Sequence, residues 1–419
     1  MKSRKIPFAV QSILSALALT LTLVPITWGA PKYKVLYAFV NKGQGWAPYA
    51  GVVFDNEGNL YGTTAGGGLY GWGTVYELTE TLHGKWSEAV LYSFCPGGWP
   101  CSDGDNPDGN IVLDKAGNLY SSTAQGGTGI PAAGTIFELS HGSGGWTHTV
   151  LYNFCSRHDC SDGSGPGGNM VMDQHRNLYG AAAYAFELSP DSDGWTERVL
   201  HRFCPGCKGG SGPAAGVIMD LAGSLYGTTG TGGRGTKCSA YGCGTAYELS
   251  PTAGGRWKEC VLHSFGSFTG DGIFPGVGAL AFGVSGSLYG TTEIGGATGN
   301  GTVFKLTRSA NGHWKDTILY SFKHGPSGSG PSGGVIVDKA GNVYGTTMYG
   351  GDARCDCGVV YKLSPCVHGR WKYTVLHAFI GSDGAAPEAN LILDSKGNLY
   401  GTTPIGAAPG VGVVFEITP

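Results

Sequence analysis

A five-residue phrase that recurs seven times constrains the fold of this chain more than any other feature. The phrase reads Val-Leu-Tyr-Ser-Phe or a close variant, and its copies lie about 49 to 62 residues apart. The copies span residues 35–39, 90–94, 150–154, 199–203, 261–265, 318–322 and 375–379. Repeats of this length are typical of proteins in which each copy forms one small structural unit.

Each copy also carries the same order of short apolar segments, which predicts four β-strands. Strand a is an apolar run that ends at Asp in six copies, and strand b reads Leu-Tyr-Gly-Thr-Thr. Strand c reads Gly-Thr-Val-Phe-Glu-Leu, and strand d runs from a Trp through the Val-Leu-Tyr phrase. Gly, Pro, Asn or Asp bounds each segment, as expected for strands joined by tight turns. The prediction is an all-β, seven-bladed β-propeller of four-stranded antiparallel blades, with an extended β-array as the alternative.

The two ends of the chain predict how the ring closes. Residues 33–39 form a strand d without companions, whereas the last repeat stops after strand c at residues 413–417. Pairing of the N-terminal strand with the last blade would remove two exposed sheet edges, which otherwise promote aggregation. We therefore expect a closed ring.

An Asp-x-x-Gly-Asn sequence or a close variant joins strand a to strand b. The Asp side chain can bind its own downstream backbone, and the Gly can adopt a positive φ. We interpret the repeated Asp as a turn residue rather than as a metal ligand. The residues are Asp55, Asp114, Asp173, Asp220, Asp338 and Asp394, and Gly283 stands near this place in the fifth copy.

Residues 1–30 are predicted to be a signal peptide. Lys2, Arg4 and Lys5 precede an apolar run over residues 8–26, and a small-residue cleavage pattern precedes Ala30. The run is long for a signal peptide, so an uncleaved anchor is the alternative. Residues 31–419 would then be a single propeller domain of an exported protein, located outside the cell, at the cell surface or in the periplasm. We expect no membrane span apart from the N-terminal signal.

The composition agrees with many short strands and argues against a nucleic-acid partner. The chain holds 76 Gly among 419 residues, and 11% of its residues are aromatic. Disordered chains are poor in aromatic residues. A net charge of −3 supplies no attraction to nucleic acid or to anionic lipid. We expect a monomer that does not bind nucleic acid.

The cysteines occur mostly as close pairs, which predicts disulfides that staple individual loops. An even number of cysteines behind an export signal favours disulfides. The Cys204–Cys207 spacing also fits a redox or metal motif, but the two preceding repeats carry pairs at other spacings in the same loop. The pairs are Cys95/Cys101, Cys155/Cys160, Cys204/Cys207, Cys238/Cys243 and Cys355/Cys357. Cys260 and Cys366 are left over, and Cys366 is an alternative partner for Cys355.

Alternation of strand direction places the b–c and d–a loops on one face and the a–b and c–d turns on the other. The b–c and d–a loops vary in length and content, and variable loops on a rigid frame usually carry binding. An Asp-Gly-x-x-Pro sequence occurs four times in the d–a loops and leads into strand a, the innermost strand. We therefore expect its Asp residues around the mouth of the central channel, where they could hold Ca²⁺, a cationic group or sugar hydroxyls. The sequence favours the other interpretation, an Asx turn that starts strand a. The residues are Asp103, Asp162, Asp271 and Asp383.

Aromatic residues in the same loops are further candidates for ligand binding. They could stack on sugar rings or anchor a protein partner, or they could pack against neighbouring blades. The candidates are Trp46, Trp72, Trp99 and Tyr241. His201, His263 and His377 replace Tyr at one repeated position of strand d, which favours a packing role over catalysis.

The repeated phrases resemble the GloVer tandem repeat of bacterial choice-of-anchor surface proteins. The resemblance covers nearly all of residues 33–419, and Val-Leu-His-Ala-Phe at residues 375–379 is more weakly similar to the extracellular HAF-type repeats. The resemblance implies an exported bacterial protein of the cell envelope, often tethered by a C-terminal anchor, and it implies no biochemical activity. This chain departs from the pattern because it ends without such an anchor.

The sequence favours a non-enzymatic binding or scaffold protein that recognises an extracellular glycan or protein through the b–c/d–a face. It shows no nucleophile elbow, no zinc-spaced His set and no helix start that could cradle a phosphate. We therefore assign no catalytic residue and no cofactor other than Ca²⁺. The alternative is a propeller enzyme of the lactonase, lyase or glycosidase type, with a metal or acid site at the channel mouth.

Overall fold

The computed structural model describes residues 30–40, 43–204, 206–213, 215–238, 241–276, 278–408 and 410–419. The predicted signal peptide therefore lies outside the described residues, apart from Ala30. Within the described part of the chain, no helix has the length and apolar character needed to cross a membrane.

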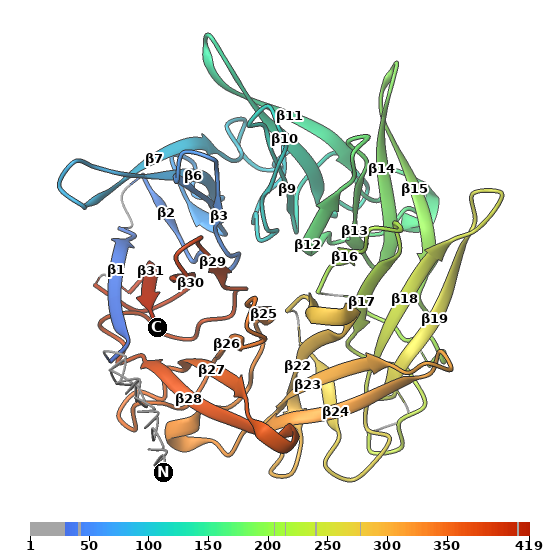
Figure 1. Ribbon diagram of the computed structural model, residues 1–419. Coiled ribbons are helices and arrows are strands. Elements are labelled where there is room, and N and C mark those ends of the chain that lie inside the picture. Colours follow the sequence, from blue (N-terminus) through green and yellow to red (C-terminus); the bar gives the residue numbers. More distant parts are fainter. Residues whose placement is uncertain are drawn as a thin grey trace, which may run out of the picture. The chain divides into compact units, whose positions relative to one another are not determined.

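Seven small antiparallel sheets form a ring, which confirms the predicted seven-bladed propeller (Figure 1). Blade 1 contains β3 (Val53–Phe54), β4 (Leu60–Thr64), β6 (Thr74–Glu80) and β7 (Trp86–Ser93). Blade 2 contains β8 (Val112–Leu113), β9 (Leu119–Thr123), β10 (Thr135–Gly142) and β11 (Gly145–Asn153). Blade 3 contains β12 (Gly167–Met172), β13 (Leu178–Ala182), β14 (Tyr184–Asp191) and β15 (Gly194–Arg202). Blade 4 contains β16 (Ile218–Met219), β17 (Leu225–Thr229), β18 (Thr245–Pro251) and β19 (Trp257–Ser264).

The other three blades follow the same plan. Blade 5 contains β20 (Gly272–Pro275), β21 (Ala281–Phe282), β22 (Leu288–Gly295), β23 (Thr302–Arg308) and β24 (Trp314–Ser321). Blade 6 contains β25 (Ile336–Val337), β26 (Val343–Thr347), β27 (Val359–Pro365) and β28 (Trp371–Ala378). Blade 7 contains β29 (Ile392–Leu393), β30 (Leu399–Thr403), β31 (Val413–Thr418) and β1 (Lys32–Ala38). A two-stranded ribbon of β2 (Gly45–Trp46) and β5 (Gly66–Gly67) lies in the loops of blade 1.

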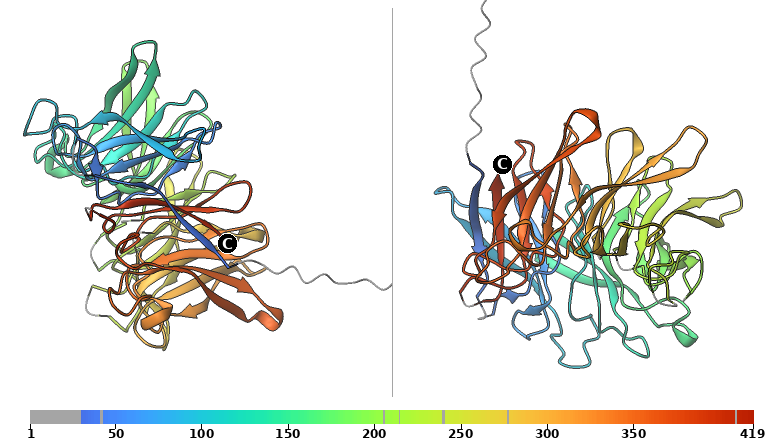
Figure 2. Two further views of the ribbon diagram at one scale, coloured as in Figure 1. Left: turned by 90° about the vertical axis from the view of Figure 1, so that its left-hand side faces the viewer. Right: turned by 90° about the horizontal axis from the view of Figure 1, so that it is seen from below.

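The N-terminal strand closes the ring, as predicted from the ends of the chain. β1 pairs antiparallel with β31, from Lys32 opposite Thr418 to Ala38 opposite Val413. The two strands lie side by side in both further views (Figure 2). Phe39, which follows β1, is fully buried. The last blade is therefore completed by the first segment of the domain.

Apolar contacts between neighbouring blades form the core. The first five residues of strand b are buried in every blade, because each face of the strand packs on a neighbouring blade. In one cluster, Val75 and Phe94 of blade 1 pack with Leu119 and Phe137 of blade 2. Each blade is thus stabilised by the two beside it.

The a–b turns confirm that the repeated Asp is a turn residue. In blade 6, Asp338 Oδ1 accepts hydrogen bonds from the backbone N–H groups of Ala340 (2.9 Å) and Asn342 (2.8 Å). Its Oδ2 accepts further bonds from the Asn342 side chain (2.7 Å) and from the Tyr344 hydroxyl (3.0 Å). All four of these hydrogen bonds come from residues 340–344, so the Asp338 carboxylate is engaged by its own turn and the strand that follows it.

We expect Asp338→Ala to destabilise the protein by about 2 kcal/mol, because several donors lose a charged acceptor at once. Asp338→Asn retains the Oδ1 acceptor and should cost less. Urea unfolding of both variants checks this, with the exposed neighbour Lys339→Ala as the matched control. An Asp338→Ala variant as stable as Lys339→Ala would contradict the turn assignment.

Five disulfides join the five predicted pairs. They link Cys95–Cys101, Cys155–Cys160, Cys204–Cys207, Cys238–Cys243 and Cys355–Cys357. Cys355 therefore pairs with Cys357 rather than with Cys366, and both Cys260 and Cys366 are free and exposed. Each bridge closes a short segment of one d–a or b–c loop. The disulfides constrain the loops of the candidate binding face and do not connect distant parts of the ring.

Candidate binding site at the channel mouth

Seven equivalent positions surround the centre of the ring, where the inner segment of each blade begins. Three of them hold Asn and four hold a residue with no side chain or a single methyl group. In chain order they are Gly51, Asn110, Asn169, Gly216, Ala279, Gly334 and Asn390. The small residues leave space at the centre that the longer asparagine side chains can enter.

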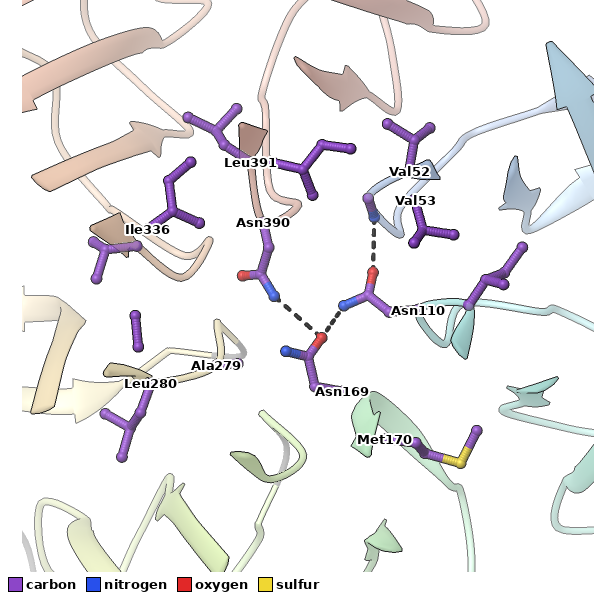
Figure 3. Close-up of a pocket in the computed structure, with 15 residues that line it drawn as sticks. Val52, Val53, Asn110, Asn169, Met170, Ala279, Leu280, Ile336, Asn390 and Leu391 are labelled. Carbon is purple, nitrogen blue, oxygen red and sulfur yellow. Dashed lines mark hydrogen bonds between the residues drawn. The ribbon is translucent and has the colours of Figure 1, made fainter. Parts of the chain in front are cut away.

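The three asparagines bind one another across the channel (Figure 3). Asn169 Oδ1 accepts a hydrogen bond from Asn110 Nδ2 and another from Asn390 Nδ2 at 3.2 Å. The remaining amide oxygens accept from backbone: Asn110 Oδ1 from Gly51 N–H (2.9 Å) and Asn390 Oδ1 from Gly334 N–H (2.8 Å). A Cβ atom on Gly334 would lie 2.4 Å from Asn390 Oδ1, so this contact requires glycine. The network fixes the orientation of all three amides.

An apolar hollow of about 290 Å³ lies beside the asparagine network. Its walls are the side chains of the inner strands, as Figure 3 shows. They include Val52, Ile111, Met170, Leu280, Ile336 and Leu391. This hollow supplies no charged group.

A second hollow of about 350 Å³ lies where the d–a loops enter the inner strands, and it is acidic. Tyr49, Asp108 and Glu388 line it together with Asn110 and Asn390. None of its described lining residues is basic. We refer to this second hollow as the channel mouth.

Burial makes the carboxyl groups of the channel mouth weaker acids than usual. It raises the pKa of Asp108 to about 6. Burial and, to a lesser extent, the neighbouring carboxylate of Glu293 raise the pKa of Glu388, and burial raises the pKa of Glu293. Asp108 Oδ1 is buried and has no hydrogen-bond partner among the described residues. A buried carboxylate oxygen without a partner is costly, and a ligand that donates a hydrogen bond would remove that cost.

The four loop aspartates lie elsewhere, at the outer strand d of four different blades. Each carboxylate accepts a hydrogen bond from a backbone N–H of its own loop and contacts the aromatic side chain of the preceding strand d. The contacts are Asp103 with Tyr92 (2.8 Å), Asp162 with Tyr152 (2.8 Å), Asp271 with His263 (3.1 Å) and Asp383 with His377 (2.9 Å).

These aspartates therefore do not share one centre. Among the described residues, the one group of three potential metal ligands contains Asp271 but none of the other three. The Asp precedes the Pro that leads into strand a by four residues, so the side chain is still at the outer strand when the chain turns inward. Binding of Ca²⁺ or a sugar by these aspartates stays a prediction.

The four predicted aromatic residues are all exposed. Their exposed fractions run from 38% for Trp72 and 39% for Trp46 to 67% for Tyr241 and 77% for Trp99. Trp46 and Trp72 lie close together, because Gly67 connects them. Gly67 forms a β-bridge with Trp72, and it pairs with Gly45, the residue before Trp46. Tyr49, which lines the channel mouth, is three residues from Trp46 and is also exposed. Trp46 and Trp72 are thus exposed in the loops of blade 1, near in sequence to the Tyr49 that lines the acidic hollow.

The sequence interpretation missed Asp108, Glu293, Glu388 and the three asparagines. A signal for the asparagines was present, because Asn occupies three of seven equivalent positions that otherwise hold Gly or Ala. A polar side chain among residues without one, at the axis of the predicted ring, indicates a specific contact there.

Solved structures with the same fold include an enzyme of glycoside hydrolase family 74. A protein from Lactobacillus plantarum is 15% identical, with a TM-score of 0.51 over 85% of this chain and 98% of that one. An ancestral GH74 enzyme is 11% identical, with a TM-score of 0.57 over 89% of this chain and 48% of that one. This chain thus spans about half the length of the GH74 enzyme. At these identities the likeness shows the fold alone.

Comparison at the level of sequence identifies the family. No curated protein matches the chain. The sequence profile of the Gloeobacter/Verrucomicrobia repeat matches residues 22–189 and 277–419, which is most of the chain and confirms the resemblance carried by the repeated phrases. The chain is therefore a member of the Gloeobacter/Verrucomicrobia repeat family.

Proposed function

We propose that this protein is an exported, non-enzymatic propeller that binds a glycan at the channel mouth. The observation that carries the proposal is the unpartnered, buried oxygen of Asp108 in a hollow that also holds exposed Tyr49. Sugar hydroxyls donate hydrogen bonds to carboxylates, and aromatic faces present the large apolar surface that sugar rings stack on. Trp46 and Trp72 extend this aromatic surface outward.

The disulfides support a location outside the cytoplasm. Five bridges within short loops are typical of proteins that fold in an oxidising compartment. This agrees with the predicted signal peptide. Extracellular and envelope glycans are the sugars that such a protein would meet.

A glycan array probed with the purified protein tests the proposal, followed by titration of the best ligand with variants. We expect Trp46→Ala, Trp72→Ala and Asp108→Asn each to weaken binding about tenfold or more, because stacked aromatics and buried acceptors dominate such sites. Leu221→Ala is the matched control, since Leu221 is fully exposed in an a–b turn on the opposite face. Full affinity in all three variants would overturn the proposal that the glycan binds at the channel mouth.

The second candidate is an enzyme that uses the same carboxyl groups. The raised pKa of Asp108 is what a general acid needs near neutral pH. Incubation of the bound glycan with the protein, followed by detection of new reducing ends, separates the two functions. Turnover that Asp108→Asn abolishes would replace binding by catalysis, whereas binding without turnover supports the primary proposal.

A further inference from the structure

Each junction between neighbouring blades repeats one pair of side chains on adjacent strands d. One member is the Tyr or His of the Val-Leu-Tyr phrase, and the other comes from the neighbouring blade, two residues after its Trp or at the matching position of β1. In ring order the pairs are Tyr37/Glu88, Tyr92/His148, Tyr152/Glu197, His201/Glu259, His263/Asp316, Tyr320/Tyr373 and His377/Tyr33. The repeat thus provides six internal comparisons for any one junction.

Three of these junctions show how the position is filled by packing alone. The ring centroids of Tyr92 and His148 lie 4.2 Å apart in a stacked pair, and those of Tyr320 and Tyr373 lie 4.1 Å apart. Tyr33 stacks on His377 at 3.7 Å. At these three junctions, ring stacking joins the two members of the pair.

The junction between blades 4 and 5 differs, because a histidine there faces two carboxylates. His263 Nε2 lies 3.1 Å from Asp271 Oδ2 and 3.8 Å from Asp316 Oδ2. One ligand atom from each of the three residues falls within 4.8 Å of the others. His263 lies on β19, Asp271 immediately before β20, and Asp316 on β24, so the group spans the two blades.

Both carboxylates are buried, and one accepts no hydrogen bond from the described residues. The Asp271 side chain is fully buried and that of Asp316 is 1% exposed. Neither carboxylate oxygen of Asp316 has a hydrogen-bond partner among the described residues. In the part of the chain that the structure describes, no Lys or Arg forms an ion pair with either aspartate. Two ionised, buried acids beside one imidazole leave a net negative charge that a bound cation would balance.

We propose that His263, Asp271 and Asp316 bind one Zn²⁺ ion between blades 4 and 5. Imidazole nitrogen and carboxylate oxygen bind Zn²⁺ at about 2.0 to 2.2 Å, which places neighbouring ligand atoms of a tetrahedral site about 3.3 Å apart. The observed separations of 3.1 and 3.8 Å bracket that value.

The surroundings of the three side chains fit a metal site. The Ser267 N–H donates a hydrogen bond to Asp271 Oδ2 (2.8 Å) and orients that carboxylate, as outer groups do in metal sites. A hollow of about 380 Å³, which Lys208 and Arg234 also line, reaches His263 and Ser264, so water has access to the imidazole. The ion would join two blades that are otherwise held by side-chain packing.

Zinc binding to the full-length protein tests this proposal. Cys260→Ser and Cys366→Ser are introduced first, because exposed thiols bind Zn²⁺ themselves. After treatment with a chelator, this background protein should bind one Zn²⁺ per chain in calorimetry, and Zn²⁺ should raise its Tm by mass action. Asp316→Asn should weaken zinc binding about tenfold or more.

Two further variants separate loss of the metal site from loss of the fold. The pair His263→Tyr with Asp316→His rebuilds the Tyr92/Asp103/His148 junction that blades 1 and 2 already contain, and it should fold without binding zinc. His377→Tyr changes the histidine of another junction and should bind zinc like the background protein. In crystals grown with Zn²⁺, the anomalous signal of zinc should lie between His263, Asp271 and Asp316.

Three results would overturn the proposal. They are the absence of saturable zinc binding by the background protein, equal affinity in Asp316→Asn, and an anomalous peak at another position. The first would assign the group instead to a contact between His263 and two carboxylates that holds no metal ion.

Discussion

A variant that begins at residue 43, and so lacks β1, should unfold at least about 6 °C below a variant that begins at Ala30 and keeps it. Deletion of β1 removes the ladder with β31, and it removes the burial of Leu36 and Phe39. Burial of each large apolar side chain contributes about 1.5 to 3 kcal/mol, so the total loss should exceed about 5 kcal/mol. The expected drop in Tm follows from that loss.

The shorter variant should also associate with itself. Without β1, strand β31 becomes an open edge that carries Val413, Phe415 and Ile417, and open apolar edges pair with other chains. Thermal unfolding and light scattering of the two variants check both effects, and a synthetic peptide of residues 30–40 should restore part of the lost Tm. Equal Tm values for the two variants would show that closure by β1 does not stabilise the ring.

Three acids with raised pKa values should together lower the unfolding free energy by about 3 kcal/mol between pH 5 and pH 8, and His148, His201 and His377, whose pKa values are lowered, oppose this change. Burial raises the pKa of Glu88 and of Glu197 to about 7, although the Tyr37 hydroxyl opposes the rise at Glu88 and Arg157 opposes it at Glu197. Burial also raises the pKa of Asp108 to about 6. In the unfolded chain these groups ionise near pH 4, so between about pH 4 and pH 7 the folded state holds more protons. The contribution of these three groups to stability therefore decreases with rising pH across that window.

This expected change in the unfolding free energy is well below the sum that the three pKa shifts would give, because Glu88 and Asp108 are only partly shielded from water. Urea unfolding at four pH values measures the slope. Glu88→Gln and Glu197→Gln should each flatten it, whereas the exposed Glu57→Gln should leave it unchanged. A slope that neither Glu88→Gln nor Glu197→Gln changes would contradict the raised pKa values of these acids.

The repeated phrases carry most of the information about the fold. Strand d is bounded by a Trp and a Phe in most copies, and the a–b turn is specified by an Asp whose hydrogen bonds lie within seven residues. These features are local, so they can be read from any single copy. Ring closure required only the further observation that the first and last repeats are incomplete.

The candidate site depends instead on contacts that no single copy contains. Asn110 is 59 residues from Asn169, and Asn390 is 221 residues from it. The three amides meet only because seven blades bring equivalent positions to one axis. For the loop aspartates, the sequence identified the residues but not their partners. Asp103 accepts a hydrogen bond from the Tyr92 hydroxyl, because at Asp103 the loop still lies beside the outer strand.

Closure by β1 also determines when this protein can finish folding. The partner of the first strand is the last strand of the domain, and their contacts span nearly the whole domain. Early blades can form in sequence, but blade 7 cannot be completed until residues 413–418 are available. The entropic cost of closing so long a loop grows only with the logarithm of its length. Contacts between residues this far apart in the sequence nevertheless slow folding. Completion of the native ring thus requires the whole domain, from β1 to β31.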